Sequence, residues 1–238
     1  MKKAVVIGVH ADMGLGGQLC RRFAKLGLEV YIAGRTKKAI DKIATDIKKG
    51  GGKAVAVPTD ATDENSVSQL FKEIGSDLDL AIYNVGNNTP GKIIEMSCDY
   101  FEQSWRVCCL AGFIFGKEAL KYFVPQKKGT ILFTGASASW RGKAGFGAFN
   151  SAKGGLRQLA QAMAKEYGPI GIHVGHIVVD GIINGQMIRN RRPEIVKMVG
   201  EEKLIDIQSI VDGYVFMYNQ SKTGWTFELD VRNNSENW

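Results

Sequence analysis

The chain has 238 residues, of which 45% are hydrophobic and 23% charged, with 31 Lys and Arg against 24 Asp and Glu. This composition is typical of a globular protein with an α/β core, and it excludes a disordered or fibrous chain. No apolar run is long enough to span a membrane. The apolar stretch after the basic N-terminus ends by His10, which is too short for a signal peptide. We therefore expect a cytoplasmic protein.

Part of the net charge of +7 lies in one run, Arg189, Arg191 and Arg192. Such a run is typical of a solvated loop, and an anion-binding or nucleic-acid role is the alternative. No aromatic residue is interleaved with these arginines, so base stacking has little support and we do not expect a nucleic-acid partner. The four cysteines fit neither a zinc pattern nor a disulfide scaffold, so we expect reduced thiols and no metal site.

Short apolar runs alternate with longer amphipathic segments. The apolar runs predict strands at 3–9, 29–34, 53–58, 79–85, 129–135, 172–179 and 225–231. The amphipathic segments predict helices at 14–27, 37–49, 99–124, 149–168 and 205–218, and a further helix capped by Thr62. This alternation indicates a Rossmann-type, doubly wound parallel sheet of about seven strands with helices on both faces. No linker divides it, so we expect a single α/β domain over residues 1–238.

The first predicted strand runs into a glycine-rich loop and then into a helix. Gly8, Gly14 and Gly16 would permit a tight turn, a close backbone approach to a pyrophosphate, and packing of the helix on the strand. The helix N-terminus at Leu15 would offer N–H groups to phosphates. His10 lies in the same loop and is a candidate to face the cofactor. A plain turn between strand and helix is the alternative.

The ends of the next three strands carry further candidate cofactor contacts. A carboxylate after the second strand would bind the 2′-hydroxyl of NAD, whereas Arg35 at that position suits a 2′-phosphate. NADP is therefore favoured over NAD, and a surface arginine is the alternative. Asp60 could accept a hydrogen bond from the adenine amino group, and Gly86 would let the backbone approach the cofactor. The candidates at these strand ends are Arg35, Thr36, Asp60, Ala61, Asn84, Val85 and Gly86.

These features resemble the short-chain dehydrogenase/reductase family over essentially the whole chain. "YNVG" at 83–86 stands for the family's Asn-Asn-Ala-Gly element, and Lys153 for the lysine of its Tyr-x-x-x-Lys motif. "VVDGII" at 178–183 is similar to the family's Pro-Gly segment. The resemblance implies that Gly181 and Ile183 contact the cofactor and that Lys153 binds the nicotinamide ribose, with catalysis as its alternative role. It also implies a homodimer or homotetramer and a substrate lid at about 184–202.

The catalytic set departs from the family pattern at three positions. Phe149 falls where the family has its Tyr proton donor, Ala136 where it has Ser, and Cys108 where it has Asn. Losing a positioned general acid costs ~10²–10⁴ in rate, so these changes argue against the usual carbonyl chemistry. Ser137 or Ser139 could supply a hydroxyl after a small shift of the loop. The candidate catalytic residues are Lys153 and Ser137.

Two functions remain open at this point. The favoured one is an NADP-dependent oxidoreductase that transfers a hydride to or from an unidentified small substrate, with an atypical proton donor. Its acceptor would be an activated double bond, an imine, or a carbonyl protonated by water. The alternative is a non-catalytic NADP(H)-binding protein, such as a redox sensor or partner subunit, which the three replacements motivate.

Overall fold

Seven parallel strands form one sheet in the order β3-β2-β1-β4-β5-β6-β7 in the computed structural model, which describes residues 1–236. Strands β4 and β6 are buried along their whole length because helices cover both faces of the sheet. The strands are β1 (Lys3–Ile7), β2 (Glu29–Gly34), β3 (Lys53–Pro58), β4 (Leu78–Tyr83), β5 (Gly129–Ala136), β6 (Ile172–Asp180) and β7 (Glu228–Arg232).

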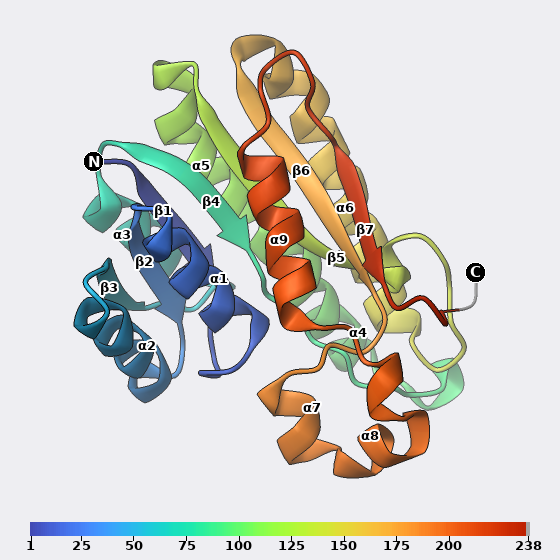
Figure 1. Cartoon of the computed structure of the whole chain (residues 1–238). Coiled ribbons are helices and arrows are strands. Elements are labelled where there is room, and N and C mark those ends of the chain that lie inside the picture. Colours follow the sequence, from blue (N-terminus) through green and yellow to red (C-terminus); the bar gives the residue numbers. More distant parts are fainter. Residues whose placement is uncertain (237–238) are drawn as a thin grey trace.

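Two helical layers enclose the sheet (Figure 1). Each helix turns an apolar stripe inward: α2 buries Ile40, Ile43, Ala44 and Ile47, which share one helix face. One layer holds α1 (Leu15–Lys25), α2 (Lys37–Lys49) and α9 (Ile207–Tyr218). The other holds α3 (Glu64–Ile74), α5 (Ala111–Gln126) and α6 (Gly147–Tyr167). The expected doubly wound parallel sheet with helices on both faces is confirmed.

The strand order reverses between β1 and β4, and the backbones after these two strands meet there. A Cβ on Gly8 would lie 2.5 Å from the carbonyl oxygen of Asn84, and Gly8 has a φ of +92°. Only glycine accepts both constraints without strain. The reversal therefore fixes the ligand-binding crevice of such a sheet between the loops after β1 and β4.

The structure corrects several predicted helix boundaries. The long helix expected at 99–124 is α4 (Cys98–Trp105), a π-helical segment η2 (Arg106–Leu110) and α5. Pro125 does not end α5, because it lies in the last turn, where its missing N–H costs one hydrogen bond. Thr62 does not cap α3, because its N–H and hydroxyl both donate to Asp60; Asp63 is the cap instead and accepts from the N–H of Asn65.

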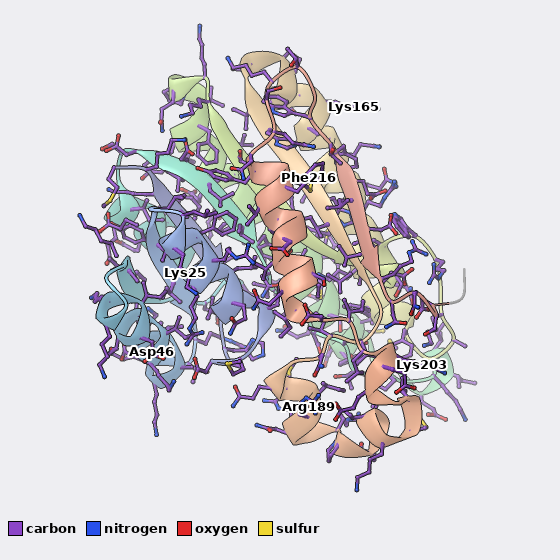
Figure 2. The ribbon with its side chains drawn as sticks, viewed as in Figure 1. Lys25, Asp46, Lys165, Arg189, Lys203 and Phe216 are labelled. Atoms are coloured by element: carbon purple, nitrogen blue, oxygen red, sulfur yellow. The ribbon has the colours of Figure 1, made fainter. Side chains whose placement is uncertain are left out.

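Beyond the carboxyl ends of the strands lie α7 (Gln186–Arg191), α8 (Pro193–Val199) and η5 (Glu201–Lys203), at the foot of the view in Figure 1. Figure 2 shows Arg189 in this segment, away from the helices that cover the sheet. Arg189 donates to Asn184 at 2.8 Å and to Glu201 at 3.0 Å. Part of the arginine run is therefore neutralised within the segment.

Within residues 1–236, no helix has the length and hydrophobicity needed to cross a membrane.

Candidate functional site

The glycine-rich loop folds back on the first turn of α1. Gly14 is the N-cap of α1 with extended backbone, and Leu15 begins the helix. A Cβ on Gly16 would lie 3.2 Å from Asn84 Nδ2, so this glycine lets α1 approach the end of β4. A Cβ on Gly17 would lie 2.5 Å from the carbonyl oxygen of Asp12. The first turn of α1 thus directs its N–H groups toward the crevice, as phosphate binding requires.

Gly34, which was not predicted as a site residue, is the most crowded glycine of this region. It ends β2, and a Cβ on it would lie 2.0 Å from the carbonyl oxygen of Val9 in the glycine-rich loop. The sequence signal was available, because a glycine ends the second strand immediately before Arg35. Any larger residue at this position would displace the loop.

The glycine-rich loop is two residues longer than is usual in the family, and Asp12 fastens it. The Asp12 carboxylate pairs with Arg21 of α1 and with Lys42 of α2, and both bases also contact Asp46 at 3.2 and 3.0 Å. Burial acts to raise the pKa of Asp12, but hydrogen bonds from Lys42 and Arg21 bring it below its usual value. Through Asp12, the longer glycine-rich loop is therefore bound to both α1 and α2.

The residues after β2 and β3 lie at one edge of the crevice. Arg35 and Thr36 are exposed at the end of β2, and Ala61 is buried beside the half-buried Asp60. The N–H of Thr62 is the main cause of the lowered pKa of Asp60, and the charge of Arg35 contributes as well. Arg35 and Asp60, which follow two different strands, are thus close enough for their charges to interact. His10 is exposed, with its Nδ1 3.4 Å from the carbonyl oxygen of Gly8.

Lys153 is buried beneath the ends of β4 and β5, with 3% of its surface exposed. Its Nζ donates to the carbonyl oxygens of Thr134 at 2.8 Å and Val85 at 3.3 Å. It also lies 5.9 Å from the centre of the Phe149 ring. Burial lowers the pKa of Lys153, because the charged form loses hydration. Gly86 borders the lysine, since a Cβ on Gly86 would lie 3.8 Å from its Nζ.

Two of the three positions that depart from the family pattern, Cys108 and Phe149, lie near Lys153. Cys108 is fully buried; its Sγ accepts the N–H of Asn87 at 3.2 Å and its thiol faces the Asn87 carbonyl oxygen at 3.7 Å. Ala136 ends β5, and Ser137 begins the short helix η3 (Ser137–Ser139), where it is half-buried. Phe149 offers a ring face and no hydroxyl.

Gly181 and Ile183 lie where β6 gives way to the expected lid. Gly181 has a φ of +153°, and a Cβ on it would lie 2.9 Å from Ile205 Cδ1. Ile183 forms a parallel bridge with Ile205, which ties this segment to the start of α9. Just before them in the chain, the buried carboxylate of Asp180 accepts hydrogen bonds from Arg141 Nη2 at 2.9 and 3.0 Å and also pairs with Arg232 at 3.4 Å.

Sequence reasoning missed a buried polar chain next to these residues. His176 of β6 lies with its Nε2 3.4 Å from Ser139 Oγ and its Nδ1 2.9 Å from Glu228 Oε2 of β7. Glu228 also accepts hydrogen bonds from Arg157 and Trp140. His176 stands in a mostly apolar strand, and its partner is 52 positions away, so periodicity could not reveal the pair.

Acid should destabilise the protein through His176. Burial lowers its pKa from 6.5 to about 4, although Glu228 opposes the shift and Lys153 and Arg157 reinforce it. Between these values the unfolded chain binds the proton and the folded chain does not, so stability is lost as pH falls below about 6.5. We expect a loss of about 2 kcal/mol between pH 7 and pH 5 from this group. Urea unfolding at both pH values measures it, and His176→Asn should reduce the difference; an equal difference in both proteins would contradict the assignment.

Comparisons with known proteins place this geometry in a family. The sequence model described as short chain dehydrogenase matches residues 2–195. A meso-2,3-butanediol dehydrogenase from Serratia marcescens is 30% identical over 207 residues, covering 82% of this chain and 80% of that protein. The chain belongs to the short-chain dehydrogenase family. The resemblance on which the sequence analysis relied is thereby confirmed.

Solved structures of short-chain dehydrogenases agree with this assignment. A short-chain dehydrogenase from Rhodopseudomonas palustris superimposes with a TM-score of 0.82 at 32% identity, covering 97% of this chain and 98% of that one. An actinorhodin polyketide ketoreductase solved with NADPH gives a TM-score of 0.89 at 17% identity, covering 100% and 98%, and shows likeness of fold. As a member of this family, the chain is an oxidoreductase. Its family membership supports a pyridine nucleotide as the cofactor.

Proposed function

We propose that this short-chain dehydrogenase transfers a hydride between NADP(H) and a small substrate, with a proton route that differs from that of its family. The observation that carries the proposal is the close approach of the loops after β1 and β4, where Gly8 and Gly16 lie against Asn84 and the buried Lys153 donates to Val85. The nicotinamide nucleotide would supply the hydride. The chain's residues would hold it: the first turn of α1 at the pyrophosphate and Lys153 at the nicotinamide ribose.

The remaining candidate contacts follow from the same placement. Arg35 and Thr36 would hold the 2′-phosphate, Asp60 and Ala61 the adenine, and Gly181 and Ile183 the nicotinamide side. His10, Gly14 and Leu15 would line the pyrophosphate. Residues 184–202 would form the substrate lid of a single domain that spans 1–238. All four cysteines are free thiols, which supports a cytoplasmic location, because thiols stay reduced in the cytoplasm.

A homodimer or homotetramer through α5 and α6 belongs to the same proposal. Phe113 on α5 is 42% exposed, and a groove beside it is lined by Leu120, Val124, Leu159 and Met163 of these two helices. Burial of this apolar surface would favour association of copies. Sedimentation equilibrium tests it, and Phe113→Asp should shift the mass toward the monomer.

Turnover is tested by mixing the protein with NADPH and a panel of carbonyls, enones and imines, and by following the cofactor absorbance. Substrate-dependent oxidation of NADPH is the expected result. Binding of NADPH without turnover of any panel member would favour the non-catalytic alternative, a redox sensor or partner subunit.

Arg35 should decide between NADPH and NADH. Replacing it with serine removes a charge-assisted contact to the 2′-phosphate, which is worth about 1.5–3 kcal/mol, so the Kd for NADPH should rise about 10–100-fold. The Kd for NADH should stay unchanged, because NADH lacks that phosphate. Fluorescence titration measures both constants. Lys38→Ser, which removes another exposed charge close by on α2, serves as the control; an equal effect of both variants would contradict a specific contact of Arg35.

A further inference from the structure

We propose that Ser139 is the catalytic residue that exchanges a proton with the substrate oxygen, and that His176 and Glu228 position and activate it. The proposal rests on the proposed function, because it concerns the proton that accompanies hydride transfer. At the two positions where the family has the hydroxyl groups of a Tyr and a Ser, this chain has Phe149 and Ala136, which carry no hydroxyl. The proton that accompanies hydride transfer therefore needs a carrier other than these two hydroxyls.

Ser139 brings a hydroxyl to the strand end from which the family's serine is missing. The Oγ of Ser139 accepts the N–H of Ala136 at 3.2 Å, because η3 turns the chain back on the end of β5. Ser139 therefore sits beside the backbone of Ala136, the position that carries the serine in the family. Ser137 occupies the first position of the same turn, and its carbonyl oxygen accepts from Trp140 and Arg141.

The contacts of Glu228 set the direction of the hydrogen bonds. Arg157 donates to both its oxygens, at 2.6 and 2.9 Å, and Trp140 donates at 3.0 Å, which holds the carboxyl group ionised. An ionised carboxylate only accepts, so His176 donates its Nδ1–H to Glu228. In the neutral ring Nε2 then carries a lone pair, which faces the Ser139 hydroxyl at 3.4 Å. This is the order of groups that activates a hydroxyl in serine–histidine–acid arrangements.

The imidazole ring of His176 fits beside β5 only because residue 135 is a glycine. A Cβ on Gly135 would lie 2.3 Å from His176 Nε2, so only glycine at this position of β5 lets the ring occupy its place. His176 is fully buried and Ser139 is 8% exposed. The ring is thus shielded from water, and the serine, which is also buried, keeps a small exposed fraction.

In the direction of alcohol oxidation, a bound oxidised nicotinamide nucleotide would take the hydride from the carbinol carbon, and the substrate hydroxyl proton would pass to Ser139 Oγ. The original hydroxyl proton of Ser139 passes to His176 Nε2, and Glu228 stabilises the imidazolium that forms. The substrate becomes a carbonyl compound, and the reverse sequence reduces it. The substrate class is therefore an alcohol or the corresponding carbonyl compound.

The tautomer of His176 tests the proposal without any substrate. The chain has three histidines, so ¹⁵N-histidine labelling and a His176→Asn variant assign the resonances. At pH 7 we expect a neutral ring protonated at Nδ1, with Nε2 accepting. A proton on Nε2 would overturn the proposal, because the ring would then donate to Ser139 and could not take its proton. Glu228→Gln should weaken the preference for the Nδ1 tautomer.

The kinetic arm uses NADP with a panel of secondary alcohols. Ser139→Ala should lower kcat by ~10²–10⁴ and leave the Kd for NADPH unchanged, whereas Ser151→Ala on the exposed side of α6 should leave both unchanged. A loss confined to Ser137→Ala would overturn the proposal, and so would nucleotide binding without turnover of any alcohol or ketone. Failure of the wild-type protein to bind NADPH would instead refute the proposed function.

Discussion

Replacing Gly34 with alanine is expected to abolish nucleotide binding and to lower the free energy of unfolding by about 3 kcal/mol, the upper part of the range for overpacking. The new Cβ would lie 2.0 Å from the carbonyl oxygen of Val9 and 3.0 Å from its carbonyl carbon. Backbone cannot swing aside as a side chain does, so the glycine-rich loop has to move away from β2. Denaturant unfolding and an NADPH titration of the same preparation measure the two effects.

Gly154 provides the matched control. It lies inside α6, and a Cβ on it would meet no atom within 4 Å. Gly154→Ala should therefore stabilise the protein by up to about 1 kcal/mol through helix propensity. Equal stability of the Gly34→Ala variant and the parent protein would show that the loop does not pass β2 as the structure has it.

Replacing Lys153 with methionine is expected to weaken NADPH binding about 10–100-fold, since a charge-assisted hydrogen bond to the ribose is lost. In the structure the Nζ already donates to Val85 and Thr134, and both carbonyl oxygens would lose that donor. Methionine has a similar length and fills the buried site, so the fold should survive. Isothermal titration measures the binding, and circular dichroism checks the fold.

The control for Lys153 is a lysine outside the site. Lys165 lies near the other end of α6, at the top of the view in Figure 2. Lys165→Met should leave the Kd for NADPH unchanged. Retained NADPH affinity in the Lys153→Met variant would remove the ribose-binding role and leave this lysine a structural part of the core.

Most of the fold could be predicted because its signals are local. The helix expected at 37–49 matches α2, since its apolar residues repeat with helical spacing and Gly50 to Gly52 follow it. The break at η2 could not be predicted, because a π turn there depends on how Cys108 and Cys109 pack against other elements. Thr62 has the right side chain for a cap, and the competing hydrogen bond to Asp60 decided against it.

Some residues of the candidate site could likewise be predicted from the sequence, and others could not. Residues after parallel strands share one edge of the sheet, so the sequence alone could predict that Arg35, Asp60 and Asn84 lie around one crevice. Gly34 was visible in the sequence as the last residue of the second strand, but the Val9 carbonyl oxygen that crowds it was not. Gly135 could not be singled out, because the His176 ring that crowds it comes from another strand. His176 resembled a core residue of an apolar strand, and Glu228 resembled the polar side chain of an edge strand. Only the pairing of β6 with β7 brings these two together.

The most direct test of the account is a fluorescence titration of the purified protein with NADPH and with NADH. We expect saturable binding of both nucleotides, with NADPH the tighter ligand because Arg35 would pair with its 2′-phosphate. Absence of binding of either nucleotide would contradict the central claim that the crevice between β1 and β4 holds a pyridine nucleotide.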